Sequence, residues 1–203
     1  MPIKRRNFSR AYGQASYRKL FLISCEGAIT EPRYFAFFNS EYVTINCLYE
    51  IGKSAPNQVL KRMKATLDKT PLRDGDETWM VVDKDRWTDA QLDALQQWVL
   101  AEEKVSRGLA LSNPKFEYWL LLHFAEDDGA GDYSRRLGQY LPGYNKCLDM
   151  HVFNLDKIKA AIDRAKQRDN PPCVTWPQSA GTTVYRLVQN IISSNEPNDT
   201  CAG

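Results

Sequence analysis

The chain has 203 residues, a net charge of +2, and 43% hydrophobic and 26% charged residues, the composition of an ordinary globular protein with one substantial core. No apolar run approaches the roughly 20 residues that a membrane span needs, and no signal peptide opens the chain. The five cysteines are scattered without C-x-x-C spacing, so a structural zinc site is not expected and a reduced, cytoplasmic setting is.

The first 18 residues are expected to form a basic arm. Residues 1–19 are rich in lysine and arginine, and no acidic residue precedes Glu26. Because cations with interleaved tyrosines suit a nucleic-acid backbone, Arg5 and Arg6 are candidate phosphate contacts. A solvated terminal tail is an equally open interpretation.

Apolar and amphipathic segments alternate through the next hundred residues. Strands are expected at 19–25, 42–49, 78–82 and 106–111, and helices at 30–39, 56–69, 88–101 and 114–124. This order predicts an α/β fold with a mostly parallel four-stranded central sheet flanked by helices.

The last third of the chain is expected to be more helical. Helices are predicted at 133–140, 155–167 and 182–193. The predicted organisation is therefore a basic arm at 1–18, an α/β core at 19–125 and a helical C-terminal region at 126–203 that packs on the core.

Gly52-Lys53-Ser54 has the last three residues of a Walker A phosphate loop. That loop needs a glycine five positions before its second glycine, where this chain has Cys47, and the following helix begins late, after Pro56. A plain turn is therefore favoured. Lys53 is kept as a candidate phosphate contact.

Carboxylates directly follow two of the apolar strands. Glu26 ends the first strand, before Gly27, and Asp83-Lys84-Asp85 follows the third. In extended backbone the two aspartates share a face, where they repel each other unless a cation lies between them. Because ligand sites of parallel sheets lie beyond the carboxyl ends of the strands, Glu26, Asp83 and Asp85 are predicted to form one metal site. The alternative is an acidic turn in which one aspartate caps the next helix.

The fourth predicted helix carries an isolated acid. Ser112 or Asn113 is expected to cap this helix, with Pro114 in its first position. Glu117 lies in an otherwise apolar stretch, so it must be paired with another group, exposed to solvent or part of a functional site. The helix dipole can also stabilise an acid at this position. His123 is interpreted as a hydrogen-bonded core histidine rather than a ligand.

Together these motifs resemble those of the RloB-like proteins, bacterial proteins found beside restriction–modification and antiphage loci. The resemblance rests on 25–27, 30–35, 83–85, 112–124 and 181–185. It covers residues 20–124 well and the C-terminal third thinly. It implies a Toprim-like domain, the fold of primases, topoisomerases and OLD-family nucleases, in which a glutamate follows the first strand and a D-x-D motif follows the third.

The resemblance and the residues agree on metal-dependent hydrolysis of phosphodiester bonds, in RNA such as tRNA or in DNA. Glu26, Asp83 and Asp85 are expected to bind Mg²⁺ or Mn²⁺, with Glu26 also a candidate general base. Glu31 or Glu117 is expected to complete a second metal site. In OLD-type nucleases a second acid follows the first glutamate closely, and Glu31 comes one position late for that spacing.

Four further cations are candidates for offsetting phosphate charge. They are Arg33, Lys53, Lys84 and Lys115. Lys115 has the best position, because it lies near a predicted helix N-terminus at the end of the fourth strand.

The resemblance also implies a partner and a role in defence. RloB-like proteins are commonly encoded beside an AAA/ABC-type ATPase, RloA, and this chain has no convincing ATP motif of its own. The expected role is the effector of an antiphage or abortive-infection system, as a monomer or a homo-oligomer. The main alternative is a catalytically silent Toprim-like module that binds nucleic acid or the ATPase. A primase or topoisomerase is disfavoured, because the chain lacks room for their extra domains.

Overall fold

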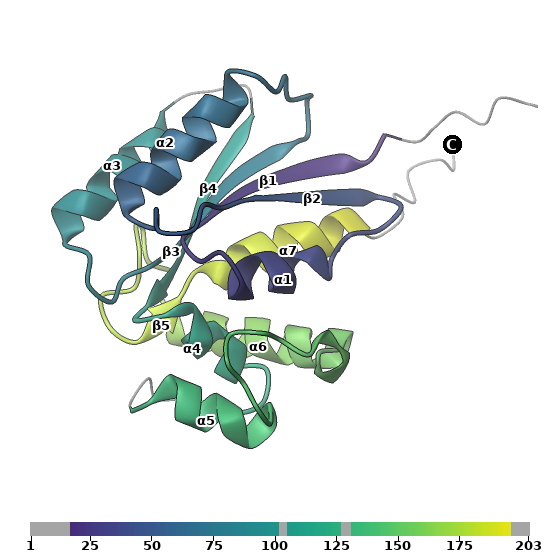
Figure 1. The fold of residues 1–203 in the computed structure, drawn as a ribbon, viewed down its shortest axis with the longest axis vertical. Coiled ribbons are helices and arrows are strands. Elements are labelled where there is room, and N and C mark those ends of the chain that lie inside the picture. The colour runs from purple at the N-terminus through teal and green to yellow at the C-terminus, as the bar shows by residue number, and fades with distance from the viewer. Residues whose placement is uncertain (1–16, 102–104, 127–130, 196–203) are drawn as a thin grey trace, which may run out of the picture.

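One five-stranded sheet organises the structure, a computed structural model that describes residues 17–101, 105–126 and 131–195 (Figure 1). The strands are β1 Lys19–Cys25, β2 Val43–Leu48, β3 Glu77–Asp83, β4 Ser106–Asn113 and β5 Gly181–Thr182. Their order is β2-β1-β3-β4-β5, and the first four run parallel. The fold is therefore of the predicted Toprim-like α/β class, with one strand more than expected.

The additional strand, β5, pairs antiparallel with the end of β4. Thr182 lies opposite Ser112, and their hydroxyl groups are hydrogen-bonded at 2.9 Å. The Thr183 N–H donates to Leu111 O at 2.8 Å. The sequence predicted a helix from residue 182, which is wrong, because α7 begins at Val184. A strand of two residues has no periodicity to reveal it.

Helices cover both faces of the sheet (Figure 1). They are α1 Thr30–Ala36, α2 Pro56–Leu67, α3 Asp89–Leu100, α4 Phe116–Leu121, α5 Tyr133–Tyr140, α6 Leu155–Arg168 and α7 Val184–Asn195, with a 3-10 turn at Met150–Val152. Helices α2 and α3 pack on one face, whereas α1, α4 and α7 pack on the other, and α5 and α6 pack against α4. Within the described ranges, no helix is both long and apolar enough to cross a membrane.

The central strands are buried on both faces, which explains their continuous apolar sequences. Successive side chains of a strand point to opposite faces. Phe21 and Ile23 of β1 join the core under α1, α4 and α7, while Leu22 joins Met80 and Val82 in the core under α2 and α3. Two separate cores thus hold the sheet between its helices.

The C-terminal helix contributes to the same core as the first strand. Leu187, Val188 and Ile191 of α7 are fully buried in the cluster that contains Phe21 and Ile23. Removing their area from water stabilises the sheet by about 25 cal/mol per Å² of apolar surface. The C-terminal segment therefore packs on the α/β core rather than forming a hydrophobic core of its own.

Candidate active site

The acids of the two strand ends meet at the carboxyl edge of the sheet. Strands β1 and β3 are parallel neighbours, with Cys25 paired to Val81. The Glu26 N–H continues this pairing by donating to Val81 O at 2.8 Å, and the Asp83 N–H donates to Glu26 Oε2 at 3.1 Å. The Glu26 carboxylate is therefore held across the end of β3, next to Asp83.

The Glu26 side chain is largely enclosed, with 10% of its surface exposed. The Trp87 indole N–H donates to both of its oxygens, at 3.1 and 3.2 Å, and the Arg86 guanidinium lies 3.9 Å from Oε1. Burial raises the pKa of Glu26, while the hydrogen bonds from Asp83 N–H and Trp87 lower it and the charge of Asp85 raises it. The pKa of Glu26 is raised overall, so its charge is only partly compensated.

Asp83, the last residue of β3, lies among other acids. Its Oδ1 accepts a hydrogen bond from the Phe116 N–H at 2.8 Å. Burial, followed by the charges of Glu31, Glu26 and Glu117, raises the pKa of Asp83 well above its ordinary value. A carboxylate in such surroundings favours the uptake of a proton or a cation.

Neither aspartate of the D-x-D motif caps the helix that follows it, so the capping alternative is wrong. Thr88 precedes α3, and its N–H donates to Gln91 Oε1 at 3.0 Å in a capping box. Asp85 accepts instead from the Arg86 N–H at 2.5 Å and lies 3.7 Å from the Lys115 ammonium. The helix start has its own cap, and both aspartates remain available to the site.

Glu31, from the first turn of α1, is 6% exposed. Its Oε1 accepts a hydrogen bond from the Gly27 N–H at 2.9 Å. Burial, opposed by backbone hydrogen bonds and reinforced by the charges of Glu117 and Glu26, raises the pKa of Glu31 to about 7. A Cβ at Gly27 would lie 2.1 Å from Glu31 Oε2, so only glycine allows this close approach.

Glu117 lies on α4 and faces the same site. The Tyr144 hydroxyl donates to Glu117 Oε1 at 3.2 Å. Burial and then the charge of Glu117 raise the pKa of Tyr144, so its hydroxyl keeps the proton that it donates. Glu117 is thus a partly buried acid, and among the described residues no cation forms an ion pair with it.

The start of α4 differs from the prediction, which placed Pro114 in the first helical position. The helix begins at Phe116, and Pro114 belongs to the preceding turn. Pro114 O accepts hydrogen bonds from the N–H groups of Lys84 and Asp85, at 3.1 and 3.0 Å. These bonds tie the segment after β4 to the D-x-D motif and bring Glu117 to the strand ends.

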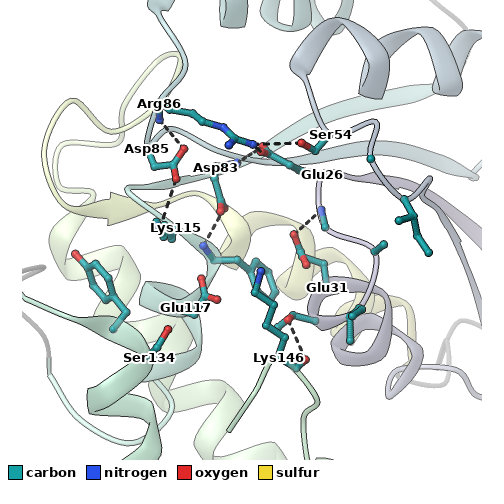
Figure 2. A pocket seen from close by; sticks show the side chains of 18 of the residues that line it. Glu26, Glu31, Ser54, Asp83, Asp85, Arg86, Lys115, Glu117, Ser134 and Lys146 are labelled. Atoms are coloured by element: carbon teal, nitrogen blue, oxygen red, sulfur yellow. Dashed lines mark hydrogen bonds and ion pairs between the residues drawn. The ribbon is translucent and has the colours of Figure 1, made fainter.

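The carboxylates surround one pocket of about 730 Å³ (Figure 2). The predicted acids that line it are Glu26, Glu31, Asp83, Asp85 and Glu117. The basic side chains that line it are Arg86, Lys115 and Lys146. The predicted acids come from three separate segments of the chain, and the topology of the sheet brings all five together.

The predicted cations lie in different places. Lys115 lines the pocket and approaches Asp85. Lys84, by contrast, forms an ion pair with Asp89 at 2.6 Å and also donates to Trp87 O at 3.2 Å. Lys84 is not among the described residues that line the pocket, because the turn after β3 directs it toward the start of α3.

Two other candidates also lie off the pocket lining. Lys53 is paired at 2.5 Å with the glutamate three residues before it, and the Arg33 guanidinium donates to Cys147 Sγ at 2.9 Å. Neither is among the side chains that line the pocket in the described part of the chain. Arg5 and Arg6 lie outside the described residues, so their predicted phosphate contacts stay predictions.

Sequence reasoning missed several residues at the site, among them Arg86, Trp87 and Lys146. Arg86 lies over the Trp87 ring at 4.8 Å and donates to Ser54 Oγ at 3.3 Å, so its guanidinium is held beside the pocket. Arg86 and Trp87 directly follow the D-x-D motif, and this position was the signal that could have identified them. Lys146 comes from a distant loop, where the Thr30 hydroxyl donates to Lys146 O at 3.0 Å, and no local pattern reveals it.

An oxygen-only donor set of carboxylates is what Mg²⁺ and Mn²⁺ prefer. Burial first, and then the charges of neighbouring carboxylates, raise the pKa of Asp83 and Glu31, and a cation bound between these acids would offset both effects. In their present positions, no three acids, cysteines or histidines of the described residues converge as metal ligands. Glu26 and Asp83 instead accept hydrogen bonds from N–H groups. The residues fit the ion chemically, and binding requires some of these carboxylates to turn.

Fold and site together define a mostly parallel α/β protein with an acidic pocket at the carboxyl edge of its sheet. Among family models, that of the RloB-like protein family matches residues 21–191. The chain therefore belongs to the RloB-like family, as its motifs predicted, and the matched range includes all five predicted acids of the pocket. Comparisons with curated proteins and with solved structures found no match.

Proposed function

We propose that this RloB-like protein is a divalent-metal-dependent nuclease that hydrolyses phosphodiester bonds of RNA or DNA. The observation that carries the proposal is the gathering of the five predicted carboxylates around one pocket at the carboxyl edge of a parallel sheet. A buried structural acid is normally paired with a cation, whereas here burial raises the pKa of three neighbouring acids. Such clusters are typical of functional sites.

In this proposal Glu26, Asp83 and Asp85 hold one Mg²⁺ or Mn²⁺, and Glu31 with Glu117 contributes to a second. Bound ions of this kind lower the pKa of water and stabilise negative charge on the attacking and leaving oxygens. Glu26 also accepts the proton of the attacking water. The range matched by the RloB-like family model, residues 21–191, contains all of these residues.

Arg86 and Lys115 are assigned to the phosphate of the substrate. The planar Arg86 guanidinium lies over Trp87 and is bonded to Ser54, which restricts its orientation before substrate arrives. A guanidinium matches two phosphate oxygens at once, and an ammonium acts as a point charge. Together they offset the repulsion that the acids would otherwise exert on a phosphate.

Membership of the RloB-like family supports a role as effector of an antiphage or abortive-infection system. In this part of the proposal, an ATPase of the RloA type is the partner that senses infection and controls cleavage. Copurification of the two proteins, followed by comparison of cleavage with and without ATP, tests this partnership.

The test of the nuclease is cleavage of labelled RNA and DNA by the full-length protein with Mg²⁺ or Mn²⁺. We expect Glu26→Gln and Asp83→Asn each to fold normally and to lose at least about 100-fold in cleavage rate, since even changes to outer partners of metal ligands cost 10- to 100-fold. Glu41→Gln is the matched control, because Glu41 is an exposed acid that does not line the pocket. Undiminished cleavage by both pocket variants would contradict the proposal.

A second candidate is a catalytically silent module that binds nucleic acid or the partner ATPase. It is favoured by one observation, that the acids of the described chain do not converge as metal ligands in their present positions. A metal titration followed by calorimetry separates the two candidates. Saturable Mn²⁺ binding that Asp83→Asn abolishes supports the nuclease, and its absence supports the silent module.

A further inference from the structure

Two isoleucines stand exposed at the acidic pocket. Ile51 is 87% exposed and Ile29 is 55% exposed, and both line the pocket. A single exposed apolar side chain is common on protein surfaces and needs no explanation. Two that border the same charged pocket form what we term the apolar rim, defined by Ile29 and Ile51.

The position of Ile51 is fixed by a well-anchored turn. Gly52 has a φ of +79°, which favours glycine. The Lys53 N–H closes the turn by donating to Glu50 O at 3.2 Å, so Ile51 lies at the tip of the turn. Arg62 of α2 holds this turn against the sheet by donating to Lys53 O at 3.2 Å and to Cys25 O at 2.6 Å. The backbone that carries Ile51 is therefore held close to the end of β1, where the first acid of the pocket follows.

Charge is divided between the interior of the pocket and its outer parts. Glu26 and Glu31 are 10% and 6% exposed, whereas the Arg86 and Lys115 side chains are 63% and 48% exposed. A phosphate that reaches the buried acids must bring its sugar and the adjacent bases close to the pocket walls. Bases in a duplex remain stacked inside the helix, whereas unpaired bases are free to contact apolar side chains.

We infer that the apolar rim contacts unpaired bases next to the scissile phosphate, so that the substrate is single-stranded or locally unpaired nucleic acid. The inference rests on the proposed function, because it takes the buried acids to be where the phosphate is bound. Apolar side chains pack against bases of any sequence, and the exposed cations bind neighbouring phosphates. The rim therefore selects for strand state rather than for base sequence.

Fluorescence anisotropy tests the inference without cleavage, using the full-length protein with Ca²⁺ in place of Mg²⁺. The probes are a labelled oligonucleotide, as a single strand and annealed to its complement, in RNA and DNA forms. We expect the single strand to bind at least about tenfold tighter than the duplex. Ile29→Ser or Ile51→Ser should weaken single-strand binding about fivefold and leave duplex binding unchanged, because an aliphatic contact with a base is worth no more than the lower end of the range for an aromatic one.

Two further variants sharpen the experiment. Ile51→Phe should keep or increase single-strand affinity, because an aromatic ring stacks on a base. Val174→Ser is the matched control and should bind like the wild type, since Val174 is 90% exposed and does not line the pocket. Equal affinity for single strand and duplex, or unchanged single-strand binding by both rim variants, would overturn the inference.

A parallel cleavage assay with Mg²⁺ and Mn²⁺ separates this inference from the proposed function. Equal cleavage of duplex and single strand, unaffected by Ile51→Ser, overturns the role of the rim and keeps the nuclease. A single-strand preference that depends on Ile29 and Ile51 in a protein that cleaves neither nucleic acid keeps the rim as a binding surface and overturns the nuclease.

Discussion

Two regions of this protein bury acids in opposite ways. Asp169, after α6, is paired with the Arg186 guanidinium at 2.7 Å and accepts hydrogen bonds from the Tyr185 hydroxyl at 2.7 Å and the Cys173 N–H at 2.8 Å. Burial raises its pKa, but the hydrogen bonds from Cys173, Tyr185 and Arg186 outweigh burial and lower the pKa of Asp169 overall. This acid is fully compensated and ties the loop after α6 to α7.

The acids of the pocket lack such compensation. Glu31 and Asp83 each accept a backbone N–H bond, but the charges nearest to them include other carboxylates, and the pKa of both is raised. Burial alone therefore does not distinguish a structural acid from a functional one. The sign of the neighbouring charges distinguishes the two kinds of acid. A cluster of like charges destabilises the folded protein unless a bound ligand neutralises it.

The largest expected effect on stability is at the compensated acid. Arg186→Met leaves the buried Asp169 charge without its cation, and we expect the free energy of unfolding to fall by about 3 kcal/mol. Urea denaturation followed by circular dichroism measures this change. Adding Asp169→Asn to the same chain should restore part of the loss, and a loss below about 1 kcal/mol for Arg186→Met would show that the pair is not structural.

Substitution of Glu31 is expected to raise the free energy of unfolding, whereas substitution of Arg186 lowers it. Its folded pKa of about 7 exceeds the ordinary 4.5, so the stability present below pH 4.5 is lost as the pH rises through 7. Glu31→Gln removes this loss, and we expect the metal-free variant to be about 2–3 kcal/mol more stable than the wild type at pH 8 but nearly equal to it at pH 4.

The wild type and Glu31→Gln also test metal binding. Mg²⁺ or Mn²⁺ added at pH 8 should raise the melting temperature of the wild type more than that of Glu31→Gln, because only the wild type has that buried charge to neutralise. A variant that is less stable than the wild type at pH 8 without metal would mean that Glu31 is compensated as Asp169 is.

The smallest effect on stability is expected at Gly27. Gly27→Ala places a Cβ against the Glu31 carboxylate, which can move because it ends a flexible side chain, so we expect a loss of only about 1 kcal/mol. Cleavage should fall by more than tenfold, because displaced site residues are costly to catalysis. Gly138→Ala is the control, since a Cβ added at Gly138 would meet open space and alanine favours its helix. Equal cleavage by the two variants would contradict the role of Glu31.

Local patterns were sufficient for most of the fold. The predicted strand at 19–25 is β1, and the predicted helix at 133–140 is α5, because continuous apolar runs and helical periodicity are properties of short segments. The two-residue β5 and the start of α4 were not predicted correctly. Both depend on contacts with distant segments, since β5 pairs with the end of β4 and Pro114 O bonds to the turn after β3.

The sequence by itself determined which acids follow the strands. It also determined the alternation of strands and helices, which gives a parallel sheet with those strand ends at one edge. Only the tertiary structure decided which cations join them. Lys84 and Arg86 are two residues apart, yet Arg86 lines the pocket and Lys84 pairs with Asp89 outside it. The direction of a side chain beyond the end of a strand is set by packing against remote parts of the chain, and no local periodicity encodes it.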